Sequence, residues 1–251
     1  MYLTSPQSSH FNPAKFLGRS PRENHFDWDL YYRFKDERER FWRQRVDADA
    51  DFRGQVATHF AAFQQSIEKT IELLQRVAAP RILDIGLSSE QLDRAVLTRT
   101  RGEVAVLDVQ PEAGRSYERA FGSRGSFILG DVISFAREAA ATNQFDLVYS
   151  VGLLEHFPDK TDILDAHVQL TKPGGIVLIY VPIHTAANRT LTTLIPEWEN
   201  FGHRELMTPE ELESACAHRE LQTISRETVG FFAALWARRL SSDAHNPGHA
   251  V

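Results

Sequence analysis

The stretch RILDIGLSSEQL, residues 81–92, decides the fold. Its apolar run ends in Asp84 and Gly86, which is typical of a buried strand that opens onto a tight turn. A dinucleotide-binding turn would carry further glycines, because its backbone must approach a charged phosphate bridge. Those glycines are absent here. The stretch therefore predicts a strand followed by a ligand-binding loop. The loop is either a functional cofactor site, a modified cofactor site or one that has lost cofactor binding.

Strand and helix patterns alternate on both sides of this stretch. Further apolar runs are EVAVLD (103–108), SFILGD (126–131), FDLVYSV (145–151) and GIVLIYVP (175–182). Helical patterns separate them: SEQLDRAVLTRT (89–100), PEAGRSYERAF (111–121), VISFAREAAATN (132–143) and DKTDILDAHVQLTK (159–172). Because the runs are apolar throughout, they predict a doubly wound, mainly parallel sheet with helices on both faces, an α/β fold.

The segments that flank this core have their own signals. An apolar stripe at spacings of three and four predicts a long helix, and its members are Phe52, Val56, Phe60, Phe63, Ile67, Ile71 and Leu74. The stripe either packs on the domain or forms a coiled-coil surface for a partner, and a homodimer is left open. Thr208, Pro209 and Glu211 predict a helix start with a capping box. Two runs at 221–230 and 231–240 predict a final antiparallel hairpin.

These signals divide the chain into four parts. We expect a disordered N-terminus over 1–21, a helical cap over 22–79, the main domain over 80–240 and a disordered tail over 241–251. Within the main domain, the irregular stretch 183–207 is long enough to predict a wall of a substrate site.

Composition narrows the class of protein. The chain has 28 basic and 34 acidic residues, a formal net charge of -6 and no long basic block, which argues against nucleic acid as a partner. The single cysteine, Cys216, excludes an internal disulfide and a cysteine-based zinc site, and no other cluster has metal-ligand spacing. No secretory signal and no membrane-length apolar run is present. We expect a cytoplasmic protein without a metal or a membrane partner.

Acidic residues follow three neighbouring strands. Asp84 lies at the end of the first predicted strand, Asp108 at the end of the second and Asp131 at the end of the third. In an open parallel sheet, ligands bind beyond these carboxyl ends, and an acid after the second strand can accept both hydroxyls of a ribose. Each acid alone is equally explained as a helix cap. Together they predict an adenosine site.

These segments resemble class I S-adenosylmethionine-dependent methyltransferases of the small-molecule branch, over about residues 81–240. The similarity rests on LDIG (83–86), VLDVQPE (106–112), GDV (130–132), FDLVYSVGLLEHFPD (145–159) and LTKPGGIVLIYVP (170–182). The resemblance implies a Rossmann-like sheet of seven strands and S-adenosylmethionine as the cofactor. It also implies roles: Asp108 for the ribose, Val109 for the adenine face, Asp131 and the Val132 backbone for the adenine amino group, and Asp84, Gly86, Ser88 and the Ser150 backbone for the methionine part.

The loop departs from the family pattern D-x-G-x-G-x-G. Ser88 and Glu90 stand where the second and third glycines are expected. Ser88 is small and can cap the following helix. Glu90 either crowds or pairs with the methionine end of the cofactor, or lies in the first helical turn and points to solvent, where an acid suits the helix dipole.

The acceptor side carries fewer signals. If a hydroxyl is methylated, a general base helps, and His156 just after the fourth strand is the first candidate. The resemblance also allows Glu155 and His156 to shape the loop only. Candidate substrate contacts are Tyr31, Tyr32, His184, Trp198 and His203, for which core packing or plain exposure is the alternative.

The resulting hypothesis is a methyltransferase that acts on an oxygen or nitrogen of a small-molecule acceptor. Two alternatives are kept. Glu90 and the N-terminal stripe motivate a non-catalytic methyltransferase-like protein, such as a partner subunit, with weakened or lost cofactor binding. A nicotinamide oxidoreductase is disfavoured because the phosphate-binding glycines are missing.

Overall fold

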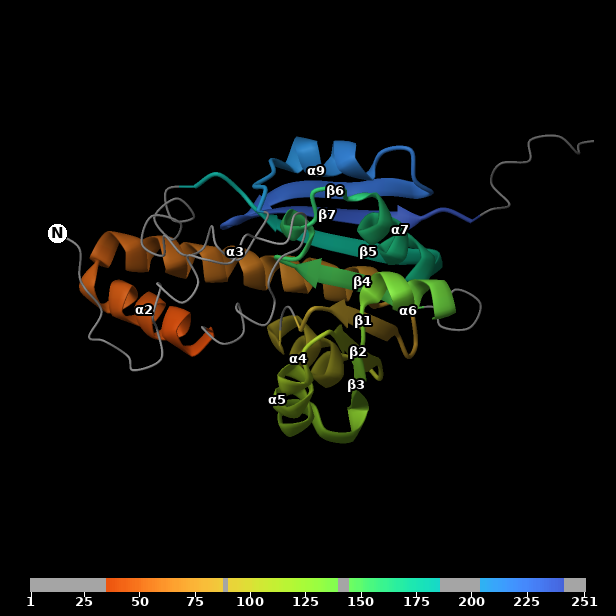
Figure 1. Ribbon diagram of the computed structural model, residues 1–251, viewed down its shortest axis with the longest axis horizontal. Coiled ribbons are helices and arrows are strands. Elements are labelled where there is room, and N and C mark those ends of the chain that lie inside the picture. The colour runs from red at the N-terminus through yellow and green to blue at the C-terminus, as the bar shows by residue number, and fades with distance from the viewer. Residues whose placement is uncertain (1–34, 88–89, 140–144, 186–203, 242–251) are drawn as a thin grey trace, which may run out of the picture.

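The computed structural model describes residues 35–87, 90–139, 145–185 and 204–241 (Figure 1). Seven strands form one sheet in the order β3-β2-β1-β4-β5-β7-β6. They are β1 (Arg81–Ile85), β2 (Glu103–Asp108), β3 (Gly125–Leu129), β4 (Phe145–Val151), β5 (Thr171–Pro182), β6 (Leu221–Val229) and β7 (Phe232–Arg239). The first five strands are parallel, and β7 runs antiparallel to both β5 and β6. The predicted sheet and its C-terminal hairpin are confirmed.

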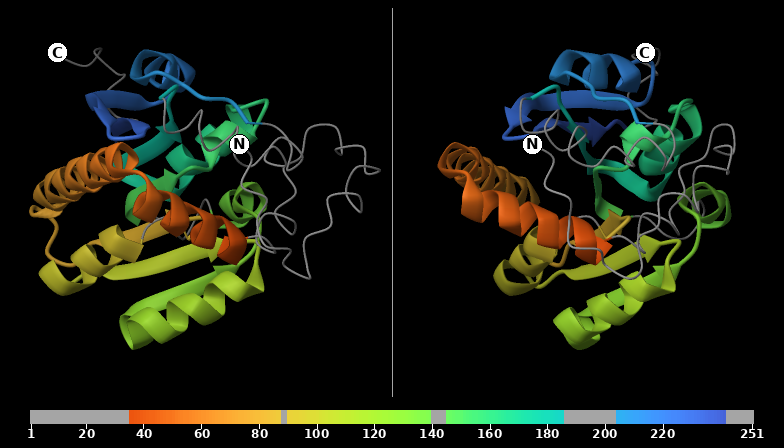
Figure 2. Two further views of the ribbon diagram at one scale, coloured as in Figure 1. Left: turned by 90° about the vertical axis from the view of Figure 1, so that its left-hand side faces the viewer. Right: turned by 60° about the vertical axis from the view of Figure 1, so that its left-hand side comes forward.

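Helices cover both faces of the sheet (Figure 2). The described helices are α2 (Lys35–Ala48), α3 (Ala50–Leu74), α4 (Glu90–Arg99), α5 (Pro111–Phe121), α6 (Val132–Ala139), α7 (Thr161–Leu170) and α9 (Pro209–Cys216). Two 3-10 turns, η2 (Gly122–Arg124) and η3 (Leu154–His156), lie between elements. The core on one face takes residues from α3, α4 and α5, and the core on the other takes residues from α6, α7 and α9.

Strand β5 shows why the runs had to be apolar throughout. Its alternate side chains belong to opposite cores: Ile176, Leu178 and Tyr180 pack with the α3 side, and Val177, Ile179 and Val181 pack with the α7 side. All six are buried. Since burial of one such side chain contributes about 1.5–3 kcal/mol, both faces of the strand stabilise the sheet.

Helix α3 carries the predicted apolar stripe and lays it on the sheet. It begins after Asp49, whose Oδ1 accepts the Phe52 N–H at 3.0 Å. Every stripe residue is buried except Phe60, which is 49% exposed, so the prediction was wrong at that position. At this level α3 passes the turn between β6 and β7, and His59 makes the contact instead by stacking on Phe231 at 4.5 Å. The buried stripe favours domain packing over the coiled-coil alternative.

Buried hydroxyls fix where α3 sits. The Tyr180 hydroxyl of β5 donates to Ser66 Oγ at 2.9 Å, and the Trp236 indole of β7 donates to Thr70 Oγ1 at 3.0 Å. A buried polar group left without a partner costs about 1–3 kcal/mol, so a shift of α3 along the sheet is disfavoured. These bonds join a helix near the start of the described chain to β5 and β7, which are neighbours in the sheet.

The C-terminal elements follow their sequence signals closely. Thr208 Oγ1 accepts the Glu211 N–H at 3.1 Å, and Glu211 Oε2 accepts the Thr208 N–H at 2.8 Å, which confirms the capping box. Gly230 makes the β6–β7 turn with φ +60. An added Cβ there would meet His59 Nδ1 at 2.2 Å, so only glycine fits beneath α3.

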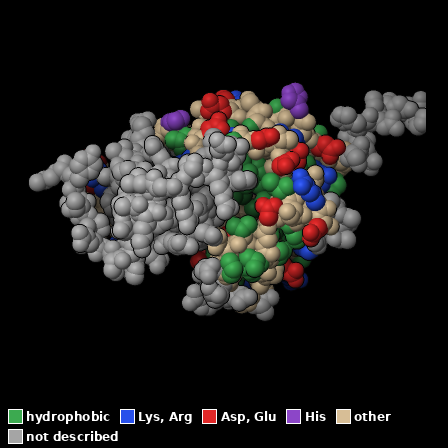
Figure 3. Space-filling view, in the orientation of Figure 1, with side chains coloured by type: hydrophobic (Ala, Val, Ile, Leu, Met, Phe, Trp, Pro, Cys, Tyr) green, Lys and Arg blue, Asp and Glu red, His purple; other side chains and the backbone are tan. Residues whose placement is uncertain are grey.

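The surface is mixed in charge. On the face seen in Figure 3, basic and acidic side chains of the described residues are scattered among other side chains. Within the described part of the chain, no helix combines the length and the apolar character that a membrane crossing requires.

Candidate cofactor and active site

The predicted site residues converge where the strand order reverses. β1 lies between β2 and β4, and these three strands are parallel, so the loops at their carboxyl ends are adjacent. The register places Ile85 opposite both Leu107 and Ser150. The loops that begin at Gly86 and Gly152 and the end of β2 at Asp108 therefore meet at one edge. This is the place where open α/β sheets bind ligands.

The turn after β1 has left-handed backbone. Gly86 has φ +90, and Leu87, which follows, has φ +42. The Gly86 N–H donates to the Leu107 carbonyl at 2.8 Å, which ties the turn to the end of β2. An added Cβ at Gly86 would meet only a Leu153 side chain at 3.9 Å, so backbone conformation, not space, demands glycine here. Ser88 lies outside the described residues.

Asp108 is held at the end of β2 with a fixed carboxylate. The side chain is 5% exposed, and its Oδ1 accepts the Gln110 N–H at 2.8 Å. The Gly130 N–H donates to the Asp108 carbonyl at 2.9 Å and so fixes the exit of β3 as well. Next to it, Val109 is 41% exposed and presents an apolar surface. An anchored acid beside an exposed apolar side chain suits a ribose beside an adenine.

Asp131 differs from the expected strand-end acid. β3 ends at Leu129, and Asp131 instead caps α6, because its Oδ1 accepts the Ser134 N–H at 2.9 Å. Asp131 is exposed, whereas Val132 is buried in the core. The helix-cap explanation holds for this acid, and its role toward adenine stays a prediction.

Ser150 turns its side chain away from this edge toward a buried histidine. Its hydroxyl lies 3.0 Å from His167 Nε2, and His167 Nδ1 lies 2.8 Å from the Ile163 carbonyl. Since that carbonyl can only accept, Nδ1 carries the proton and Nε2 accepts from Ser150. Burial lowers the pKa of His167 to about 4, so the ring is neutral at pH 7. The Ser150 side chain is thus engaged by His167, and the role of its backbone toward the cofactor stays a prediction.

His167 was not predicted from the sequence. A signal was present, because His167 lies four residues after Ile163 and three before Leu170, on the face of α7 that packs on the sheet. Both neighbours are buried. A histidine on such a face destabilises the fold unless its ring nitrogens have hydrogen-bond partners. Here both nitrogens of His167 have one.

His156 lies in a compact turn after β4. Gly152 has φ +69, and the following η3 buries both Glu155 and His156, at 3% and 5% exposed. His156 Nε2 is 3.6 Å from Glu155 Oε1, just beyond hydrogen-bond range. Burial raises the pKa of Glu155 to about 8, so this carboxyl is mainly neutral at pH 7.

The end of the 183–207 stretch is fastened to this turn. The Glu205 N–H donates to the Glu155 carbonyl at 2.9 Å, and the Met207 N–H donates to the Pro182 carbonyl at 3.1 Å. Lys160 and Glu205 form an ion pair on the same side. The segment that was predicted to wall the acceptor side thus ends against the turn that carries His156.

The remaining predicted acceptor contacts are only partly described. His184 is exposed, just past the end of β5. Tyr31, Tyr32, Trp198 and His203 lie outside the described residues, as does the N-terminal segment up to residue 34. Their contact with an acceptor stays a prediction.

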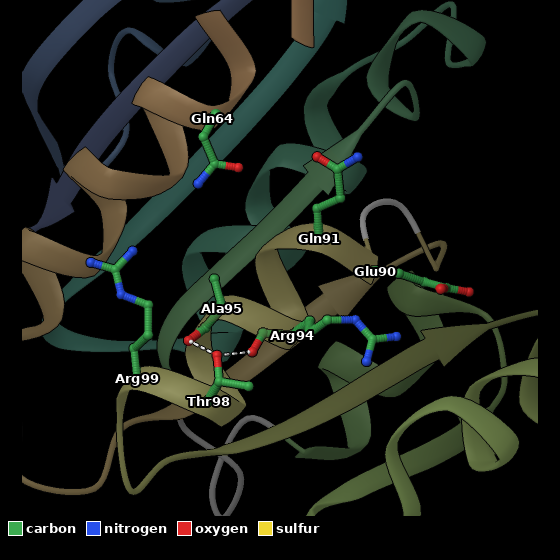
Figure 4. A pocket seen from close by; sticks show the side chains of 7 residues that line it. All are labelled: Gln64, Glu90, Gln91, Arg94, Ala95, Thr98 and Arg99. Carbon is green, nitrogen blue, oxygen red and sulfur yellow. Dashed lines mark hydrogen bonds between the residues drawn. The ribbon is translucent and has the colours of Figure 1, made fainter. Parts of the chain in front are cut away.

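Glu90 starts α4 and is exposed. This is the first-turn position of the solvent-facing alternative, where the helix dipole favours an acid. Glu90 also lines an open hollow with a volume of about 410 Å³, together with Gln64, Gln91, Arg94 and Arg99. Figure 4 shows how these side chains lie around it. The hollow lies between α3 and α4, not at the carboxyl ends of β1 and β2. Among the described residues no group of three or more acids, histidines or cysteines could hold a metal ion.

Comparison with known proteins agrees with this geometry. Residues 54–226 match a family model described as a methyltransferase domain. The ubiquinone biosynthesis O-methyltransferase of Xanthomonas oryzae pv. oryzae is 27% identical over 172 residues, which cover 65% of this chain and 70% of that protein. The N-methyltransferase NodS of Bradyrhizobium japonicum, in complex with S-adenosyl-L-homocysteine, has a TM-score of 0.51 at 19% identity over 71% of this chain and 87% of its own. The CurJ carbon methyltransferase has a TM-score of 0.58 at 16% identity over 77% and 59%. Both solved structures share the fold.

Proposed function

The chain belongs to the methyltransferase-domain family and is an S-adenosylmethionine-dependent methyltransferase. We propose that it methylates an oxygen or nitrogen of a small molecule, with a hydroxyl oxygen as the favoured acceptor. The observation that supports this proposal best is the meeting of Asp108, the Gly86 turn and the His156 turn at one edge of the sheet. The name of the Xanthomonas relative, an O-methyltransferase, favours oxygen.

The described residues fit the cofactor. The Asp108 carboxylate is held by the Gln110 N–H and can accept hydrogen bonds from ribose hydroxyls. Val109 offers an exposed apolar side chain to the adenine. The left-handed Gly86 turn leaves backbone without a Cβ facing the methionine part. Because exposed Glu90 lies in the first turn of α4, it gives no support to a chain that has lost cofactor binding.

The chain's own residues would act by alignment and proton transfer. When bound, S-adenosylmethionine supplies an electrophilic methyl group on a sulfonium. Transfer needs the acceptor held in line and kept from water. His156 is the candidate that takes the acceptor proton, because it is buried beside the segment that ends the 183–207 stretch. Glu155 is mainly neutral at pH 7, so it does not hold the ring as an imidazolium.

An acceptor panel tests the proposal. The full chain is incubated with S-adenosylmethionine and either ring-hydroxylated aromatic compounds or primary amines of matched ring structure, and the products are identified by mass. We expect methylation of a hydroxyl and release of S-adenosylhomocysteine. Methylated amines with untouched hydroxyls would assign nitrogen instead. A protein that binds cofactor but methylates neither class would contradict the proposed acceptor class.

We also infer a free small molecule as the partner and the cytoplasm as the place of reaction. Cys216 is a buried free thiol, which suits a reducing compartment. The formal charge of -6 and the mixed surface of Figure 3 offer no basic stripe for nucleic acid on the described face.

A further inference from the structure

Three buried polar side chains from three elements meet beneath the loop that follows β1. Asp84 of β1 and Tyr149 of β4 are register partners, and Asp93 of α4 packs on them. All three are fully buried, at 0% exposed. The Tyr149 hydroxyl donates to Asp93 Oδ1 at 2.7 Å. None of the assigned cofactor roles explains Asp93.

Asp93 lies in the first turns of α4, just after the loop that connects β1 to α4. The loop leaves β1 one residue after Asp84 and enters α4 at Glu90, so Asp84 and Asp93 bracket its two ends. The family pattern would set the path of this loop with glycines, and Ser88 and Glu90 replace two of them. A side-chain interaction must then hold the start of α4 against the end of β1.

We propose that Asp93, hydrogen-bonded to Tyr149 and packed beside Asp84, is a positioning residue that holds the start of α4 at Glu90 against the end of β1, and thereby fixes the two ends of the cofactor loop, residues 85–90. The proposal rests on the predicted assignment of this loop to S-adenosylmethionine. Asp93 does not touch the cofactor in this proposal. It acts by fixing the first turns of α4 on β1 and β4.

Burial and like charge favour a pair that carries one proton. Two buried carboxylates side by side repel, and burial together with the Asp84 charge raises the pKa of Asp93 well above its ordinary value. A side-chain hydrogen bond with Asp84 raises the pKa of Asp93 further, because only the neutral acid can donate it. The neutral form of Asp93 removes the repulsion from Asp84.

The other groups that face the pair do not neutralise it. Glu90 from α4 adds a further negative charge, and Tyr117 from α5 and Tyr149 from β4 are phenols whose pKa values are raised by burial and by these carboxylates. From α3, Glu68 pairs with Arg99 at the far end of α4. Loss of the proton should therefore loosen α4 and weaken cofactor binding as the pH rises.

Two variants separate a proton-dependent position from simple packing. In Asp93→Asn the amide keeps the shape, still accepts from Tyr149 and can donate to Asp84 without a titrating proton. In Asp93→Ala both contacts are lost. Asp162→Asn, on the exposed side of α7, is the matched carboxylate-to-amide control. Folding of each variant is checked by its denaturation midpoint.

The dissociation constant of S-adenosylmethionine is measured by calorimetry between about pH 6 and pH 9.5. At the acid end we expect Asp93→Asn to bind within about threefold of the unchanged protein and Asp93→Ala to bind at least about tenfold more weakly. Toward the alkaline end the unchanged protein and the Asp162→Asn control should lose affinity relative to Asp93→Asn. Parallel pH profiles, or normal binding by Asp93→Ala, would overturn the proposal.

Amide hydrogen exchange in the absence of cofactor provides a second readout. The amides of residues 86–92 should exchange faster in Asp93→Ala and at the unchanged rate in Asp93→Asn. This result is independent of the cofactor assignment. If Asp108→Ala binds S-adenosylmethionine as well as the unchanged protein does, the assigned site is wrong, whereas unchanged exchange in Asp93→Ala would refute the positioning role itself.

Discussion

Replacing His167 with glutamine should change how stability depends on pH. Burial lowers the pKa of His167 to about 4 from an ordinary value of 6.5. Between these two values the unfolded chain binds a proton that the native protein does not, so the native protein loses stability as the pH falls. About 2.5 pKa units at about 1.36 kcal/mol each amount to about 3 kcal/mol. Glutamine does not titrate and can still accept from Ser150.

The measurement is the free energy of unfolding in guanidinium chloride from about pH 7.5 down to about pH 4.5, for both proteins. Only the difference between them is informative, because Glu155 titrates with the opposite sign. Its pKa is raised to about 8, so its native form holds an extra proton and stability falls as the pH rises above 4.5. At the neutral end we expect the variant to be less stable by about 1–3 kcal/mol, because the fit around Ser150 is imperfect.

As the pH falls, the difference in free energy of unfolding should shrink by about 2–3 kcal/mol or reverse. Only the unchanged protein has a buried imidazole whose unfolded form gains a proton that the native form does not bind. The same substitution at the exposed His184, His184→Gln, is the matched control variant. A constant gap for His167→Gln would refute the claim that the ring is buried neutral behind Ser150.

Three further changes test the site and the fold. Asp108→Ala should weaken S-adenosylmethionine binding about 10²–10⁴-fold in calorimetry, since two bonds to a carboxylate contribute about 1.5–3 kcal/mol each; binding within threefold would remove Asp108 from the site. His156→Ala should lower kcat about 10²-fold or more with cofactor affinity retained, and unchanged turnover would exclude it as the base. Gly230→Ala should cost about 2–5 kcal/mol in denaturant unfolding, because the added Cβ is strained at φ +60 and would meet His59 Nδ1 at 2.2 Å; a normal midpoint would contradict the close contact.

The fold was predictable because its signals are local. All five apolar runs are strands, four of them mostly buried and β3, at the sheet edge, half-exposed, and the segment 111–121 matches α5 residue for residue. The cap formed by Thr208 and Glu211 lies within four residues of sequence, so its chemistry could be predicted without tertiary information. Because β1 and β2 are parallel neighbours, their carboxyl ends lie at the same edge of the sheet, and this brings Gly86 and Asp108 together there.

The misses depend on contacts between distant segments. Phe60 has the right spacing for the buried stripe, but its level on α3 faces the β6–β7 turn, where His59 packs instead. Asp131 has the right composition for a strand end, yet β3 already ends at Leu129 and Asp131 caps α6, which begins at Val132. The partnership of Asp93 with Tyr149 spans 56 residues, so no local pattern indicates it.

The interior position of β7, between β5 and β6, has a consequence for biosynthesis. β5 obtains its antiparallel neighbour only from residues 232–239, and α3 is fastened to Trp236 of that same strand. A nascent chain that has released α3 and β5 from the ribosome therefore still has one unpaired edge of β5, and an uncovered part of α3, until β7 emerges and inserts between β5 and β6. During the time between the synthesis of β5 and that of β7, we expect the nascent chain to bind chaperones that shield apolar segments. Slower synthesis should prolong that binding.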